Sequence, residues 1–251
     1  MDFVKMEGLG NDFVVLRGPL TPPAADAAAW CERRLGIGAD GLLVVTPLGP
    51  DRVRMQYWNA DGSPAEMCGN GLRCVGRYAV AEGLVSGPEV VVETAVGERP
   101  VRVPAEGPVR ALVGEFAEAA IPPFDLAGYH LESVSMGNPH AVAFVDDCYA
   151  VPVSAVGPIV EGDPHFPQRT NVGFATVVSS RRLDLRVWER GVGETLACGS
   201  GAAAAAALAH RRGLTGPRVT VMLPGGPLDV EVEGDRVWIE GPARMVFRGV
   251  I

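Results

Sequence analysis

The strongest constraint on the fold of this chain is that its sequence repeats. When the 251 residues are slid against themselves by 130 places, identical residues coincide in order across much of each half. The coincident pairs are Trp58 with Trp188, Cys68 with Cys198, Gly69 with Gly199, Gly71 with Gly201, Gly83 with Gly213 and Leu84 with Leu214. Ordered matches of this kind are typical of an internal duplication, so we expect two domains of one fold.

Small slips extend the repeat toward the ends of each half. A shift of 127 places brings Gly10-Asn11 onto Gly137-Asn138, and a shift of 129 brings Gly87-Pro88 onto Gly216-Pro217. We expect an N-terminal repeat at residues 1–115 and a C-terminal repeat at residues 116–240. The last stretch, 241–251, is expected to return to the N-terminal repeat as a strand.

Both halves show the same order of short strands and helices. Val-rich stretches bounded by glycine and proline predict strands at 13–16, 42–45, 52–58, 90–94, 172–178, 183–188, 219–223 and 244–250. Helical patterns cover 24–35, 71–81 and 201–212. We therefore expect an α+β fold with two pseudo-symmetric repeats, each a strongly curved, mainly antiparallel, barrel-like sheet around a central helix. Pockets between domains are common ligand sites, which places the expected active site at the domain interface.

Composition excludes several classes of function. A net charge of −8 without long charged blocks does not favour nucleic acid or an anionic membrane as a partner, and no apolar run approaches the length of a membrane span. The chain opens without the pattern of a signal peptide, so we expect a cytoplasmic protein with reduced cysteines. The four histidines and five cysteines have no zinc spacing, which predicts no metal site. Lys5 is the only lysine and a poor Schiff-base candidate, which disfavours pyridoxal phosphate.

The stretches MCGNG (67–71) and ACGSG (197–201) place two cysteines in the same setting. A cysteine where a glycine-flanked turn enters a helix lies near backbone N–H groups and the positive end of the helix dipole, which favour a thiolate and bind anions. If the repeats face each other, Cys68 and Cys198 approach one ligand from opposite sides. A thiolate and a thiol arranged in this way can remove a proton from one face of a carbon and return one to the other, without a cofactor.

Other features have simpler interpretations. Cys31, Cys74 and Cys148 lack the glycine setting and are expected to be core residues. The stretch GIGADG (36–41) matches the dinucleotide fingerprint, but a helix is expected before it and a strand after it. Because a phosphate-binding loop needs the reverse order, we interpret this stretch as a turn.

Eight motifs in order resemble those of the diaminopimelate epimerase family. They are GLGNDF (8–13), GIGADG (36–41), NADGS (59–63), CGNG (68–71), MGNPH (136–140), RTNVGF (169–174), ERGVGETLACGSG (189–201) and LPGG (223–226). The resemblance covers nearly the whole chain. It implies a cofactor-independent isomerase that converts LL- to meso-diaminopimelate, in lysine and cell-wall precursor biosynthesis, and an enzyme that often forms homodimers.

The resemblance also implies roles for individual residues. Cys68 and Cys198 resemble the family's acid and base pair, and His140 and Glu189 the groups that tune them or orient the reacting amino group. The residues that resemble the substrate-binding shell are Asn11, Asn59, Gly69, Asn70, Asn138, Asn171, Glu189, Arg190, Gly199 and Ser200. From the residues alone, Asn11, Asn59 and Asn138 are more readily explained as turn asparagines than as ligands. Gly41 stands where certain relatives carry a substrate-contacting glutamine, so we leave it out of the site.

Three other functions share some of these sequence features. A proline racemase or hydroxyproline epimerase shares the duplicated architecture and paired cysteines, but the Asn-rich shell and MGNPH suit a substrate with a second polar end. A non-catalytic amino-acid-binding protein would not need a second thiol. A thiol redox switch would not need the asparagine shell.

Overall fold

The structure is a computed structural model that describes residues 1–119 and 121–251. Its contacts divide the chain into two compact units, unit 1 comprising residues 1–111 and 240–251 and unit 2 comprising residues 112–239. The chain leaves unit 1 within β8 (Val109–Glu115) and returns to it within β18 (Arg236–Gly241). No helix among the described residues is long and apolar enough to span a membrane.

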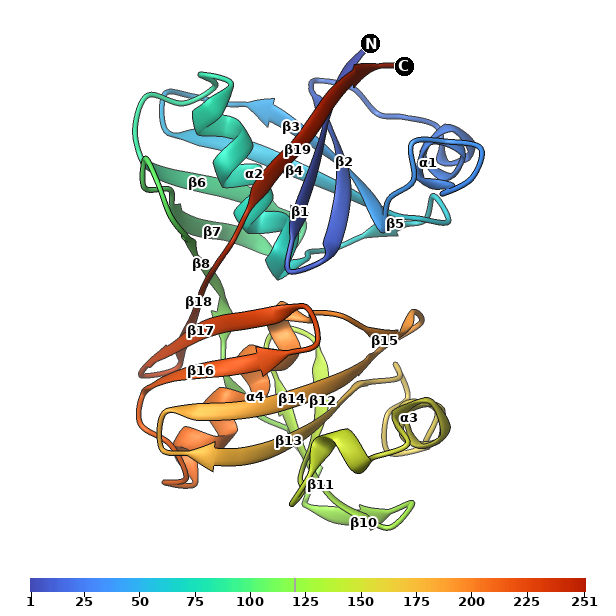
Figure 1. Ribbon diagram of the computed structural model, residues 1–251, viewed down its shortest axis with the longest axis vertical. Helices are drawn as coiled ribbons and strands as arrows, with labels where there is room; N and C mark the ends of the chain where they lie inside the picture. Colours follow the sequence, from blue (N-terminus) through green and yellow to red (C-terminus); the bar gives the residue numbers. More distant parts are fainter. Residues whose placement is uncertain (120) are drawn as a thin grey trace. The chain divides into compact units, whose positions relative to one another are not determined.

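Unit 1 is a sheet wrapped around one helix (Figure 1). Its elements are β1 (Asp2–Gly8), β2 (Asn11–Arg17), α1 (Ala24–Cys31), β3 (Gly41–Pro47), β4 (Arg52–Asn59), β5 (Pro64–Ala65), α2 (Gly69–Ala81), β6 (Glu89–Thr94), β7 (Gly97–Arg102) and β19 (Arg244–Val250). Most pairings are antiparallel, whereas β2–β3 and β4–β6 are parallel. Because α2 contacts β1, β2, β3, β4, β6, β7 and β19, it is the central helix of the unit.

Unit 2 repeats this plan. Its elements are β9 (Ala117–Glu118), β10 (Phe124–Leu126), β11 (Tyr129–Ser135), β12 (Pro139–Phe144), the short 3-10 helix η1 (Cys148–Ala150), α3 (Val153–Glu161), β13 (Asn171–Ser179), β14 (Arg182–Glu189), β15 (Gly193–Thr195), α4 (Gly199–Arg211), β16 (Arg218–Leu223) and β17 (Gly226–Glu233). The parallel pairs recur as β12–β13 and β14–β16. The central helix is α4, whose contacts run from β11 to β17. The α+β fold with two repeated units is therefore confirmed.

The two central helices bury different side chains. In α4 the alanines 202–207 are fully buried, so strands approach the helix closely on all sides. In α2 the buried face carries Leu72, Cys74, Val75 and the charged Arg73. Both helices span thirteen residues and begin at matched glycines, two residues before the starts expected from the sequence.

Two helices differ from the sequence-based expectation. The helix expected at 24–35 ends at Cys31, because the following loop folds back and its amides from Ile37 and Gly38 both bond to the Trp30 carbonyl. The helix α3 was not expected, since Gly157 and Pro158 lie inside it. A Cβ at position 157 would lie 2.4 Å from the Trp188 ring, so glycine permits this close packing.

Candidate active site

Cys68 occupies the position just before α2. It has an extended backbone (φ −137°, ψ 123°), and its carbonyl accepts the first helical bond from the Leu72 amide at 2.9 Å. The next residues, Gly69 and Asn70, form the buried first turn. Because an α-helix leaves its first amides without intrahelical acceptors, this turn presents positive partial charge beside the thiol.

Cys198 occupies the same position before α4. Its Sγ accepts from the Gly201 amide at 3.4 Å and lies 3.6 Å from the Ser200 hydroxyl. Burial raises the pKa of the Cys198 thiol well above its ordinary value, and the nearby negative charge of Glu189 raises it further. The hydrogen bonds from Ser200 and Gly201 act in the opposite direction without reversing the shift. In this state Cys198 is a neutral thiol at neutral pH.

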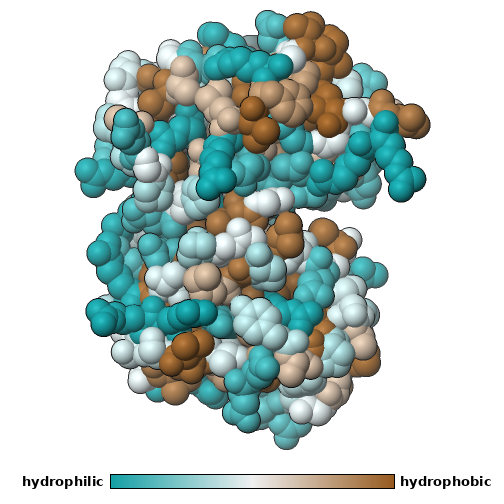
Figure 2. Space-filling view, viewed as in Figure 1, coloured by the Kyte–Doolittle hydropathy of each residue, from teal (hydrophilic) through white to brown (hydrophobic). Residues whose placement is uncertain are grey.

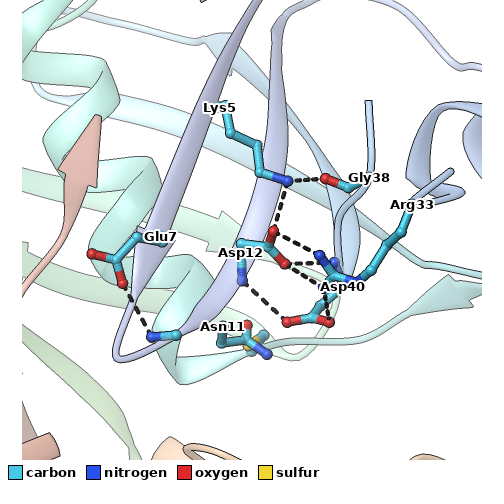
Figure 3. Close-up of polar contacts among 9 residues, drawn as sticks. Lys5, Glu7, Asn11, Asp12, Arg33, Gly38 and Asp40 are labelled. Carbon is cyan, nitrogen blue, oxygen red and sulfur yellow. Dashed lines mark hydrogen bonds and ion pairs between the residues drawn. The ribbon is translucent and has the colours of Figure 1, made fainter. Parts of the chain in front are cut away.

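Asn11, one of the residues expected to bind substrate, lies beside a cysteine. Its Oδ1 lies 3.9 Å from the Cys68 Sγ, at the start of β2. Figure 3 shows Asn11 beside a cluster of four charged side chains, which we call the β1–β3 charge cluster: Lys5, Asp12, Arg33 and Asp40. The cluster therefore adjoins the segment that carries Asn11 to Cys68.

The β1–β3 charge cluster joins three segments. Lys5 donates to the carboxylate of Asp12 at 2.7 Å and to the Gly38 carbonyl, and Arg33 bonds to both Asp12 and Asp40. The backbone amides of Asp12 and Asp40 each donate to the other residue's carboxylate, at 3.2 and 3.0 Å. Burial acts to raise the pKa of Asp12, but the bonds from Arg33 and Lys5 outweigh it and lower that pKa to about 2. Asp12 is therefore an anion throughout the neutral range.

Asn59 lies directly opposite Gly41 on the paired strands β4 and β3. Its side chain donates to the Ser63 hydroxyl at 3.0 Å, and its backbone closes the turn through Ser63 and Gly62. A Cβ at position 41 would lie 2.5 Å from Cε2 of Tyr57, so the tyrosine ring fills the space that a side chain there would need. The sequence alone did not identify Tyr57 as a neighbour of this position.

His140 and Asn138 form a pair in unit 2. The Nε2 of His140 lies 3.0 Å from the Asn138 side-chain oxygen, and the imidazole is buried. Burial, together with the positive charge of Arg190, lowers the pKa of His140 to about 3. At neutral pH this histidine is uncharged, so it donates to Asn138 as a neutral imidazole.

Asn171 and Arg190 form a second linked pair. The Asn171 side chain donates to the Pro139 carbonyl and accepts from the Arg190 amide, each at 3.0 Å. Arg190 also donates from its side chain to the Gln168 carbonyl at 3.2 Å. Asn171 thereby ties the start of β12 to the turn after β14, which places both pairs in one region of unit 2.

Two supporting residues of unit 2 were not found from the sequence. The buried Glu161, at the end of α3, accepts from the Gly191 amide at 2.9 Å and from the Trp188 indole at 2.7 Å. Thr195 donates to the carboxylate of Glu189 at 2.5 Å. Glu161 and Thr195 thus both hold the end of β14 and the turn that carries Glu189 and Arg190. An unexpected helix carries Glu161, so periodicity gave no signal for it.

Each unit therefore assembles part of the expected site. In unit 1 the structure brings Asn11, Gly69 and Asn70 to Cys68, whereas Asn59 is engaged in its own turn. In unit 2, Gly199, Ser200 and Glu189 surround Cys198, and the pairs Asn138–His140 and Asn171–Arg190 lie along neighbouring strands. Cys31, Cys74 and Cys148 are buried in the cores of the two units.

Comparison with known proteins identifies the family of this chain. The family model described as diaminopimelate epimerase matches residues 3–117 and 132–246. The diaminopimelate epimerase of Moorella thermoacetica is 44% identical over 274 residues, covering 99% of this chain and 98% of that protein. That of Pelotomaculum thermopropionicum is 42% identical over 281 residues, with 99% and 98% covered.

A solved structure of a hydroxyproline epimerase from Agrobacterium vitis superposes with a TM-score of 0.73. At 16% identity, with 99% of this chain and 91% of that chain covered, this likeness shows the fold alone. The two repeat matches and the full-length identity place this chain in the diaminopimelate epimerase family.

Proposed function

We propose that this protein inverts one α-carbon of LL-diaminopimelate to give the meso form, with Cys68 and Cys198 as the proton-transferring pair. The observation that carries the proposal is that two matched cysteines each precede a central helix in repeated units. Relatives at 40–44% identity that carry the name diaminopimelate epimerase support this substrate over proline.

In the proposed reaction one cysteine is a thiolate and the other a thiol. The thiolate takes the α-hydrogen as a proton, and the electron pair left on carbon delocalises into the α-carboxylate. The opposite thiol then delivers its proton to the other face of that carbon. Each turnover exchanges the protonation states of the two sulfurs, so no cofactor and no net proton are consumed.

The chief obstacle to this reaction is the weak acidity of the α-hydrogen. Backbone amides of Gly69, Asn70, Gly199 and Ser200, at the starts of α2 and α4, are proposed to hold the α-carboxylate where negative charge builds up. Asn11, Asn59, Asn138, Asn171 and Arg190 are proposed to bind the polar groups of the substrate, including its distal amino-acid end. Amide and guanidinium groups pair with carboxylates without taking up protons themselves. His140 and Glu189 are proposed to orient the reacting amino group and set the acidity of Cys198.

The test is α-hydrogen exchange in deuterated water, followed by mass spectrometry and chiral separation, with LL-diaminopimelate and separately with proline. We expect the protein to exchange and invert the α-hydrogen centre of diaminopimelate and to leave proline unchanged. Exchange with proline alone would favour the racemase alternative, and exchange with neither would exclude both. The Cys198→Ala variant, purified identically, controls for a contaminating enzyme.

We also propose that the protein is a cytoplasmic homodimer. Five reduced cysteines suit a reducing compartment. Figure 2 shows apolar side chains gathered at the end of unit 1 where both termini lie, and exposed residues on or beside β1 and β19 include Met1, Val246, Phe247, Val250 and Ile251. Light scattering should give a mass near twice 26.4 kDa, and Val250→Glu should shift it toward the monomer. A monomeric wild-type protein at micromolar concentration would contradict the dimer.

A further inference from the structure

Arg73 is a fully buried arginine on the second turn of α2, and its relative exposure is 0%. Its guanidinium points back toward the start of the helix. It donates to the Gly69 carbonyl at 3.4 Å, to the Asn70 side-chain oxygen at 3.0 Å and to the Pro242 carbonyl at 3.2 Å. These contacts join the first turn of α2, which follows Cys68, to the segment before β19.

All three acceptors are uncharged. Among residues 1–119 and 121–251, no carboxylate forms an ion pair with Arg73. A buried charge without a partner is costly, and an arginine side chain does not lose its proton in proteins. The site around Arg73 therefore has a net positive charge that an anion would compensate.

Three groups near Arg73 are able to supply negative charge. Burial lowers the pKa of Arg73, and negative charge on Cys74, Cys68 or Glu7 opposes that shift. Cys74 is not the anion, because burial raises the pKa of its thiol to about 12. Glu7, on β1, accepts from the Gly10 amide and lies 3.5 Å from the Arg244 guanidinium of β19. On β1 and β2, Lys5 and Asp12 pair with each other.

Because the Glu7 carboxylate is paired with Arg244, the remaining group is Cys68. Cys68 directly precedes α2, at the end of the helix toward which the Arg73 guanidinium points. We propose that Arg73 is a positioning residue that holds the first turn of α2 in place and supplies the fixed positive charge that stabilises the Cys68 thiolate. The inference rests on the proposed function, since Cys68 needs a thiolate only if it exchanges protons with a substrate.

The repeat supplies an internal contrast. The position matched to Arg73 by the 130-residue shift is Ala203, which is fully buried in α4. Cys198 instead has the carboxylate of Glu189 nearby, which favours the neutral thiol. Arg73 thus makes the two sulfurs unequal before substrate binds, so that one accepts a proton and the other donates one.

The test measures the alkylation of each cysteine in the full-length protein as a function of pH. Iodoacetamide reacts with thiolates, and mass spectrometry locates the label on Cys68 or Cys198. We expect Cys68 to reach half-maximal reactivity at a lower pH than Cys198 in the wild-type protein. Arg73→Met should lower the labelling rate of Cys68 at pH 7 by about tenfold or more, which corresponds to a pKa rise of about one unit.

Two further variants separate charge from packing. Arg73→Lys keeps the charge without the planar set of donors, so it should restore part of the Cys68 reactivity that Arg73→Met loses. Arg77→Met is the matched control: Arg77 lies on the same helix and donates to the carbonyls of Pro104 and Gly107. This control should leave the alkylation profile of Cys68 unchanged.

An Arg73→Met protein that folds, as judged by circular dichroism, and keeps the wild-type profile of Cys68 would overturn the proposal. If that variant does not fold, the wild-type protein still tests the proposal. The proposal would be overturned if Cys68 reacted only at or above the pH at which Cys198 reacts. Alkylation requires no substrate. A protein that fails the diaminopimelate exchange test but shows the shifted Cys68 profile would therefore contradict the proposed function and leave the role of Arg73 standing.

Discussion

Cys68 and Cys198 precede matched helices in repeated units, yet the charges near them have opposite sign. A buried arginine lies one turn into α2 and donates to the carbonyl of Gly69, the residue after Cys68, whereas a carboxylate acts on Cys198. The backbone frame around the cysteines is the same in both units, down to the parallel strand pairs. The comparison shows that a duplicated fold can supply two equivalent positions while a few side chains give each its own chemistry.

The two units also differ in how they hold the residues around each cysteine. Unit 1 uses the β1–β3 charge cluster beside Asn11 (Figure 3), whereas unit 2 uses Glu161 and Asn171 to hold the turn after β14. The position matched to Lys5 by a shift of 127 is Glu132, which pairs with Arg212 instead. Each unit thus has its own polar network around a common core.

The largest expected effect comes from removing either sulfur. Cys68→Ala and Cys198→Ala should each lower kcat for inversion by more than about 10³-fold, because each deletes one proton-transferring group. Chiral analysis of the product measures this. The control is Cys74→Ala, since the repeat already carries alanine at the matched position 204. Full activity in either single variant would contradict a mechanism that needs two sulfurs.

The next effect tests the β1–β3 charge cluster of unit 1. Lys5→Met leaves the Asp12 carboxylate without one of its partners in a nearly buried site, so the free energy of unfolding should fall by about 3 kcal/mol. Urea denaturation measures this change. Lys5→Arg, which keeps the charge, should lose less, and Arg34→Met at an exposed position should stay within about 0.5 kcal/mol of wild type. A loss from Lys5→Met no larger than that of the Arg34 control would show that the cluster does not stabilise unit 1.

A smaller effect is expected from neutralising the carboxylate near Cys198. Glu189→Gln removes a charge that raises the pKa of Cys198, so the pKa should fall and labelling of Cys198 by iodoacetamide at pH 7 should rise by about tenfold. The matched control is Glu194→Gln, at an exposed residue of β15 that pairs with Arg186. Unchanged labelling of Cys198 in Glu189→Gln would remove the proposed contrast between the two cysteines.

The last effect is gradual and concerns the pH dependence of stability in unit 2. The pKa of His140 is about 3 in the folded protein, against 6.5 for an ordinary histidine, so below pH 6.5 the unfolded chain binds a proton that the folded chain does not. Stability from this residue should therefore fall as pH drops from 6.5 toward 3, by at most about 1.4 kcal/mol per pH unit. Unfolding of wild type and His140→Gln at several pH values measures this slope. An equal slope in both proteins would contradict the assignment.

Much of the fold was predictable because the duplication and the strand periodicity are local properties of the sequence. The strand expected at 244–250 is present as β19 and pairs with β1. The predicted end of α1 was wrong and α3 was not predicted because both depend on tertiary contacts. A loop that folds back ended α1 early, and packing of Val153, Val156 and Val160 on the core outweighed the helix-breaking Gly157 and Pro158.

The sequence by itself determined the repeated α+β fold, the two cysteines in matched settings and the family, because these depend on residue order and spacing. Only the tertiary structure decided the surroundings of each sulfur. Arg73, Tyr57 and Glu161 act on neighbours that are distant in sequence or that lie on elements with no periodic signal. Burial set the protonation states as well, since the pKa values of His140 and Cys198 shift through loss of water, which residue spacing does not encode.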